Sequence, residues 1–238
     1  MSSTEPTAAA PVDRAAHHGA RAPGAHPELA QAVAARVAWL QGASTAEHSH
    51  PQAVAALARL RRGVGRRPGA LPEIWDDTIS LVPGHELGRT DEPSSAEHAA
   101  HTAMTVFALH RQGASRVAHA RGATVGRAVR DLSRARAVAG ADESEGVRRR
   151  FDAVLTAGAP AEGAHHLRGL VLMLRDEGIP LDYGQLAADL ADLWTPGRAD
   201  RVRLRWARQY RSTPTAEPGT DTLTDPAATD PAVNEEQA

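Results

Sequence analysis

Apolar residues recur at helical spacing through nearly all of the chain between residues 29 and 210. No segment shows the alternating β-branched pattern that is typical of a strand. The sequence therefore predicts an all-α fold, a compact bundle of about nine helices in one body or in two helical subdomains. The expected helices span residues 29–41, 51–62, 71–80, 95–112, 124–137, 143–157, 161–177, 183–194 and 197–210.

Helix starts and stops are marked by their usual residues. The runs "SSAE" at residues 94–97 and "DESE" at residues 142–145 resemble capping boxes, and Pro196 after Thr195 suits the first turn of a helix. Glycines follow three of the periodic runs and predict helix ends at Gly113, Gly158 and Gly178. The segment 161–177 is apolar around most of its circumference, which places this helix in the middle of the bundle.

The charge of the chain is unevenly distributed. All 27 basic residues other than histidine are arginine, and the formal net charge is −2. Residues 213–238 carry six acids and no arginine, whereas residues 30–212 carry 25 arginines against 20 acids. Residues 30–212 are therefore basic, and the acidic tail hides this in the net charge of the whole chain. We expect a helical domain over residues 29–212, with disordered segments at 1–28 and 213–238.

Several classes of function are disfavoured by what the sequence lacks. It contains no cysteine, hence no thiolate nucleophile, disulfide or Cys-ligated zinc. It has no P-loop lysine and no glycine-rich dinucleotide fingerprint. Residues 1–30 have no continuous apolar segment, and no apolar run approaches the roughly 18 residues of a membrane span. We therefore expect a cytoplasmic protein that is not an enzyme and carries no cofactor or catalytic residue.

Histidine is the remaining metal candidate. His98 and His101 lie one helical turn apart in "EHAAH", but the run is not the H-E-x-x-H motif and no third ligand is placed nearby. We expect no metal site there.

Arginine placement carries most of the functional signal. In residues 124–137 a narrow apolar stripe lies opposite Arg127, Arg130 and Arg134, which gives a basic ridge with its back to the core. An ordinary amphipathic helix would show the same pattern, since Asp131 can pair with Arg127. Arginines at positions 198, 201, 205 and 208 form a similar ridge beside Trp206.

The arginine triplet Arg148–Arg150 follows the start of the next helix. Glu145 precedes Arg149 by four residues and Asp152 follows Arg148 by four, so both arginines have local partners, whereas Arg150 has none. The ridges carry no stacking aromatics, which indicates contact with sugar-phosphate rather than with bases.

An ordered set of motifs resembles the CasB family, the small subunit of type I-E CRISPR Cascade surveillance complexes. The resemblance covers about residues 30–211 and rests on an Arg-rich turn followed by "LPEIWDDTISLV", "HTAMTVFALHRQG", "GATVGRAV", "VRRRFDAVL" and "HHLRGLVLMLRDEGIPLDYGQLAADLADLW". It implies an all-helical, non-enzymatic subunit that pairs with a second copy of itself. Its basic surface would stabilise the R-loop by contacting the guide RNA, the target DNA and the displaced single strand, beside other Cascade subunits.

The resemblance also implies the residues that contact nucleic acid. They are Arg61, Arg62, Arg127, Arg149, Arg150 and Arg168. Together with Arg130 and Arg134 of the ridge, they form the predicted nucleic-acid-binding set. Arg66 and Arg67 have no clear counterpart in the family and read as accessory charge in a glycine-rich connection.

Three alternatives remain open from the residues alone. A helix-turn-helix transcription regulator would need base-reading Asn, Gln or Ser on a recognition helix, and the ridges contain almost only arginine. A helical enzyme or metal carrier would use the histidines. A purely structural assembly subunit would hold protein partners and no nucleic acid.

Overall fold

The computed structural model describes residues 26–45, 49–114 and 116–212. Over these residues the backbone forms eight α-helices and three short 3-10 helices, and its only β pairing is two isolated bridges. The all-α prediction is therefore confirmed. Both expected tails lie outside the described residues, except residues 26–28, which join the first helix. The elements are α1 (Pro27–Gly42), α2 (Pro51–Arg62), η1 (Pro72–Asp77), η2 (Ile79–Leu81), η3 (Gly84–Glu86), α3 (Ser95–His110), α4 (Val125–Ala135), α5 (Glu145–Thr156), α6 (Pro160–Glu177), α7 (Tyr183–Leu193) and α8 (Ala199–Arg211).

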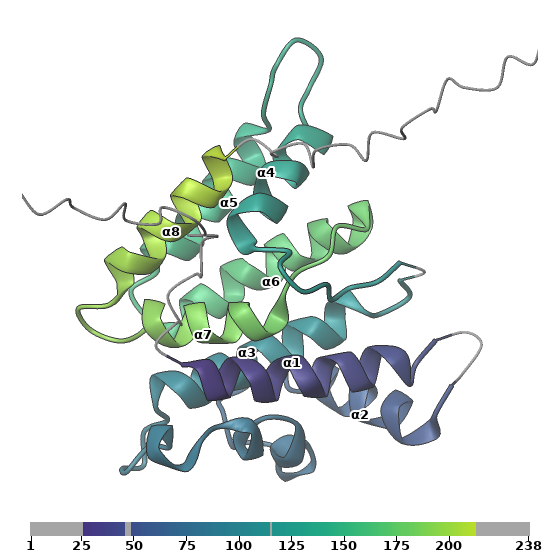
Figure 1. Cartoon of the computed structure of the whole chain (residues 1–238), viewed down its shortest axis with the longest axis vertical. Helices are drawn as coiled ribbons and strands as arrows, with labels where there is room; N and C mark the ends of the chain where they lie inside the picture. The colour runs from purple at the N-terminus through teal and green to yellow at the C-terminus, as the bar shows by residue number, and fades with distance from the viewer. Residues whose placement is uncertain (1–25, 46–48, 115, 213–238) are drawn as a thin grey trace, which may run out of the picture.

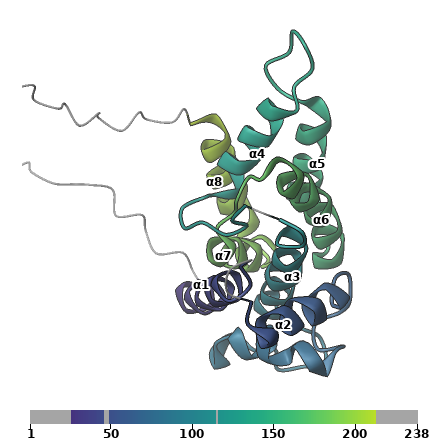
Figure 2. The ribbon, with the colours of Figure 1, turned by 90° about the vertical axis from the view of Figure 1, so that its right-hand side faces the viewer.

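The helices form two groups that share one core. Figure 1 shows α1, α2 and the 3-10 helices at one end of the long axis and α4, α5 and α8 at the other, and Figure 2 confirms this arrangement from the side. Helices α3, α6 and α7 connect the two groups, because α7 packs on α1, α3 and α8 while α6 packs on α3, α4 and α5. A single cluster of buried apolar side chains runs through all eight α-helices.

Helix α7 is more deeply buried than α6, which the sequence placed at the centre. Every residue of α7 except Gln185 is buried, whereas α6 leaves a side exposed. Small residues explain this, since a Cβ at Gly184 would overlap the carbonyl oxygen of Ala30 in α1. The close approach of α1 and α7 depends on that missing side chain.

Some of the predicted helix boundaries are right and some are wrong. The capping box is present at Ser94, whose Oγ accepts a hydrogen bond from the Glu97 N–H (3.2 Å). Gly178 ends α6 in the left-handed conformation. The box expected at Asp142 does not form, because α5 begins at Glu145 after an N-cap Ser144 that makes no side-chain cap. The last helix begins at Ala199, three residues after Pro196.

The helix expected over residues 71–80 is present only as 3-10 turns. Thr78 interrupts it with φ −138° and ψ −83°. Its hydroxyl donates to the carbonyl of Ile74 (2.7 Å), the kind of local bond by which threonine competes with helix propagation.

Buried histidines make the fold sensitive to acid. His110 is 1% exposed and its Nδ1 lies 2.7 Å from the hydroxyl of Tyr183. Burial, and secondarily the charge of Arg175, lowers the pKa of His110 to about 4. Burial also lowers the pKa values of His98, His101 and His119. All four imidazoles are therefore neutral in the folded protein at pH 7.

We expect the free energy of unfolding to fall as the pH drops from about 6.5 toward 4. The unfolded chain takes up a proton at His110 near pH 6.5, whereas the folded chain resists protonation down to about pH 4. This residue alone then costs roughly 2 kcal/mol of stability at pH 5. Urea unfolding at pH 7.5 and pH 5 measures the change. The loss should be smaller in His110→Gln and undiminished in His85→Gln, and equal stability at both pH values would contradict the prediction.

Candidate nucleic-acid interface

Arg127 and Arg134 stand on the exposed side of α4. Neither guanidinium forms a hydrogen bond or ion pair with any described residue, and both side chains are exposed. They are seven residues apart, two helical turns or about 10 Å along the axis. The apolar side chains Val125, Val129 and Leu132 are buried on the opposite side. The predicted ridge is therefore present at these two positions.

The placement of Arg130 on that ridge is wrong. Its side chain is only 2% exposed and donates to the Asp131 carboxylate (Nη2 to Oδ1, 2.9 Å) and to the carbonyl of Ser212. Helix α8 packs against α4 and covers the arc that carries Arg130. Helical spacing locates the apolar side of a helix but does not show that a second helix covers its flank. Arg130 joins α4 to the end of α8 and is not available to a ligand.

The arginine triplet on α5 is mostly paired, as the spacing predicts. Arg148 pairs with Asp152 (3.2 Å) and Arg149 with Glu145 (2.8 Å). Arg150 is exposed and bonds only to the Gly146 carbonyl in its own helix (3.0 Å). Arg150 is thus the one member of this triplet that has no acid partner within the part of the chain that the structure describes.

The basic stretch after α2 also divides into paired and unpaired residues. Arg62 donates to Glu73 through Nε and Nη2 (3.0 and 2.8 Å), and Arg67 pairs with Glu92 (3.0 Å). Arg61 is partly exposed and Arg66 is exposed, and neither has an acid partner among the described residues. Arg61 therefore differs from Arg62 in having no acid partner among the described residues. Arg66, which the sequence marked as accessory, also has none.

Arg168 lies on the exposed side of α6 and has no polar partner within the part of the chain that the structure describes. With Arg66 it lines a pocket between the loop after α2, α3 and α6. The basic stretch after α2 and the exposed side of α6 that carries Arg168 thus meet at this pocket.

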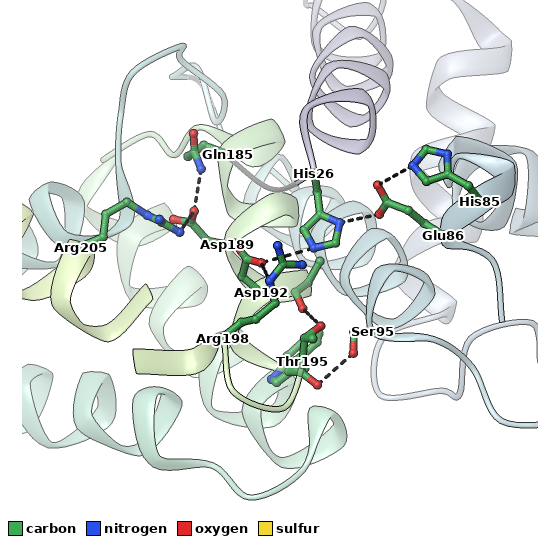
Figure 3. A network of polar contacts seen from close by, with 12 residues as sticks. His26, His85, Glu86, Ser95, Gln185, Asp189, Asp192, Thr195, Arg198 and Arg205 are labelled. Atoms are coloured by element: carbon green, nitrogen blue, oxygen red, sulfur yellow. Dashed lines mark hydrogen bonds and ion pairs between the residues drawn. The ribbon is translucent and has the colours of Figure 1, made fainter. Parts of the chain in front are cut away.

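Two of the four arginines in the second ridge, on α8, form ion pairs within the fold. Arg205 donates to buried Asp189 (2.7 Å) and Arg198 lies 3.1 Å from Asp192, so both are engaged with α7 (Figure 3). Trp206 is fully buried and its Nε1 donates to Asp189 (2.6 Å). Only Arg201 and Arg208 of this ridge are exposed without an acid partner among the described residues.

Figure 3 shows that the same polar network reaches the start of α1. His26 Nδ1 lies 2.6 Å from Glu86 and its Nε2 lies 3.5 Å from Asp192. The beginning of α1, the 3-10 segment and the α7–α8 connection are therefore joined by side chains with little exposure to solvent.

Comparison with known families decides the identity. The model of the family described as CRISPR-associated protein Cse2 matches residues 56–210. The chain belongs to the Cse2 family.

A solved Cse2-family structure agrees with this assignment. The chain is 34% identical to CasB from Thermobifida fusca, with a TM-score of 0.59, over 77% of this chain and 98% of that one. No protein of curated function matched the chain. The CasB resemblance inferred from the ordered motifs is thus confirmed, and the protein is a subunit of a CRISPR Cascade complex.

All eight predicted arginines lie within the region that the Cse2 model matches. Arg121, which the predicted set does not include, has the same exposed and unpaired character as Arg127 within the described chain. It has no acid partner among the described residues and lines a shallow surface pocket with Arg127. It is a single arginine before a glycine in a loop, so helical spacing offers no signal for it.

The described residues of this Cse2-family chain also bear on metal binding and on membrane crossing. Among the described residues no group of three or more His, Asp or Glu side chains is arranged to hold a metal ion. His101 is buried against the Gly63 carbonyl (3.0 Å). None of the described helices is both long and apolar enough to cross a membrane.

Proposed function

We propose that this Cascade subunit binds nucleic-acid backbone without reading its sequence, and that it thereby stabilises the guide RNA–target DNA hybrid and the displaced DNA strand. The observation that carries the proposal is a group of seven arginines without an acid partner among the described residues, on α2 and the loop after it, on α4 and the loop before it, and on α5 and α6; we call this group the free arginines. They are Arg61, Arg66, Arg121, Arg127, Arg134, Arg150 and Arg168. Unpaired guanidinium groups are suited to phosphate, which they bind with paired donors.

Most of the free arginines come from helices in mutual contact. Helices α4, α5 and α6 pack against one another and carry Arg127, Arg134, Arg150 and Arg168. A backbone that follows this surface would meet several of them.

The absence of stacking groups supports binding that ignores sequence. The exposed tryptophans of the described chain are Trp39 in α1 and Trp75 in η1, outside these three helices. Phe151 of α5 is buried and stacks on Trp206 and Tyr210 of α8. Without a free aromatic platform the free arginines would hold charge and sugar rather than bases.

The family membership extends the proposal to partners. We assign to this chain the other Cascade subunits, the guide RNA, the target DNA with its displaced strand, and a second copy of itself. We assign it no catalytic step, and its role in antiviral defence would be to hold the opened DNA for the rest of the complex.

We expect Arg127→Ala/Arg134→Ala to weaken binding to single-stranded DNA of scrambled sequence about tenfold at low salt. The slope of log affinity against log salt concentration should decrease by about 1.4, because each phosphate contact to a single strand contributes roughly 0.7. Fluorescence anisotropy between 50 and 200 mM salt, about the range over which such binding collapses, measures both.

The matched control is Arg201→Ala/Arg208→Ala. It removes the same charge at the same seven-residue spacing from the exposed side of α8. An equal loss in both double variants would show that binding follows net charge and not the α4 surface. A strong preference for one duplex sequence would favour a transcription regulator, and no binding at low salt would favour a protein scaffold.

A further inference from the structure

A pocket of about 530 Å³ lies between the loop after α2, the middle of α3 and the first turns of α6. The loop contributes Arg66 and Arg67, α3 contributes His98 and His101, and α6 contributes Arg168. Ligand sites in proteins typically span roughly 300–1,000 Å³, so the pocket is large enough for one nucleotide.

The exposed side of the pocket is positively charged. Its lining includes three guanidinium groups and one carboxylate, Glu92, which is occupied by Arg67 (3.0 Å). Arg66 and Arg168 are exposed and have no polar partner among the described residues. Two uncompensated guanidinium groups that line one pocket would bind an anion with several charge-assisted hydrogen bonds.

The start of α6 adds to this charge. Pro160 and Ala161 line the pocket, and the N-cap residue Ala159 provides no side-chain hydrogen bond to the first turn. The N-terminus of this 18-residue helix carries a partial positive charge, which the carboxylate of Glu162 in the first turn offsets in part. A phosphate bound by the two arginines would therefore also be favoured by α6.

One of the residues that line the pocket carries a buried polar atom without a partner. His101 is 4% exposed, and its Nδ1 forms no hydrogen bond with the described residues. Its Nε2 lies 3.0 Å from the Gly63 carbonyl, which can only accept, so Nε2 carries the hydrogen. Burial lowers the pKa of His101 although the carbonyls of Gly63 and Arg66 act against it, and the ring is neutral at pH 7. Nδ1 is therefore an acceptor that needs a donor, since an unsatisfied buried polar atom costs free energy.

The lining of the pocket also includes apolar side chains. They are those of Val64, Pro68, Val106 and Ala164. A nucleotide offers a partner for each of these three features: a phosphate, a ring with apolar faces, and an N–H donor on the edge of the base.

We infer that this pocket accommodates one nucleotide of a bound single strand. Its phosphate lies on Arg66 and Arg168, its base contacts the apolar side chains of the lining, and an amino or imino group of the base donates to Nδ1 of His101. The inference rests on the proposed function, because a strand must reach this surface. The same chemistry would hold a free nucleoside monophosphate, and the test distinguishes the two sources.

The experiment titrates the full-length protein with cytidine 5′-monophosphate, with cytidine and with inorganic phosphate. Binding is followed by the side-chain ¹⁵N resonances of histidine. The monophosphate should bind about tenfold more tightly than either fragment, and the Nδ1 resonance of His101 should shift on binding. Arg66→Ala/Arg168→Ala should lose about tenfold in affinity for the monophosphate, whereas the Arg201→Ala/Arg208→Ala control should keep it.

The outcomes separate this inference from the proposed function. If inorganic phosphate binds as tightly as the monophosphate, or Nδ1 of His101 does not respond, the pocket is at most an anion site and the inference falls. If scrambled single strands bind through Arg127 and Arg134 but no monophosphate binds, the inference falls and the proposed function stands. If the monophosphate binds and single strands do not, the strand assignment is overturned and the pocket serves a free nucleotide.

Discussion

Replacing Gly126 by alanine is expected to lower the free energy of unfolding by about 3 kcal/mol or more. Gly126 lies in α4 where this helix crosses α8, and the added methyl group would overlap the carbonyl oxygen of Trp206. It would also lie 2.6 Å from Cβ of Gln209 and 2.9 Å from the backbone nitrogen of Tyr210. These are backbone and first side-chain atoms that cannot rotate away, so the two helices would have to separate.

Gly169→Ala on α6 is the matched control. A Cβ at Gly169 meets no atom within 4 Å. The same substitution there should raise stability by up to about 1 kcal/mol, because alanine favours the helix over glycine. Urea unfolding of the two variants measures both effects. Stability of Gly126→Ala within about 0.5 kcal/mol of the unaltered protein would contradict the close α4–α8 contact.

Replacing Asp189 by alanine should lower the free energy of unfolding by about 3–5 kcal/mol. The carboxylate is 1% exposed and accepts hydrogen bonds from Gln185 (2.6 Å), Arg205 (2.7 Å) and Trp206 (2.6 Å). Burial raises the pKa of Asp189, while its three partners act in the opposite direction. Removing the acceptor would leave a partly buried guanidinium and a buried indole N–H without partners.

The control for Asp189 is an acid in an exposed ion pair. Asp200 pairs with Arg203 (2.8 Å), but its side chain is 93% exposed. Asp200→Ala should change the free energy of unfolding by less than about 1 kcal/mol. Thermal and urea unfolding of both variants test the contrast, and equal losses would show that the buried network contributes no more than a surface pair.

The helices were predictable because their signals are local. Apolar spacing, the box at Ser94 and the glycine at Gly178 act within a few residues of one another. Residues 71–80 form 3-10 turns that are interrupted where the backbone of Thr78 leaves the helical region, which periodicity does not detect. The deep burial of α7 depends on the contact of Gly184 with α1, distant in sequence.

The candidate site was predictable only where charges pair locally. The pairs of Arg149 with Glu145 and Arg148 with Asp152 follow from four-residue spacing. The pair of Arg62 with Glu73 depends on the path of a loop, and the burial of Arg130 depends on the position of α8. Spacing alone therefore cannot separate free arginines from structural ones.

The same limit applies to the pocket. Arg66, His101 and Arg168 come from three segments that only the tertiary fold brings together. From the sequence Arg66 was accessory charge, and His101 was a weak metal candidate. Neither could be associated with a nucleotide before the orphaned Nδ1 atom was located.

The contact between α1 and α7 governs how the chain acquires its core during translation. Leu29, Val33 and Val37 of α1 are fully buried in the finished protein, and α7 is one of the helices that cover α1. The ribosome adds about 140 residues between the end of α1 at Gly42 and the start of α7 at Tyr183. At roughly 5–20 residues per second this takes on the order of ten to thirty seconds. For that time the apolar side of α1 lacks the part of its native cover that α7 supplies, and the exposed side chains favour aggregation of the N-terminal half until α7 emerges.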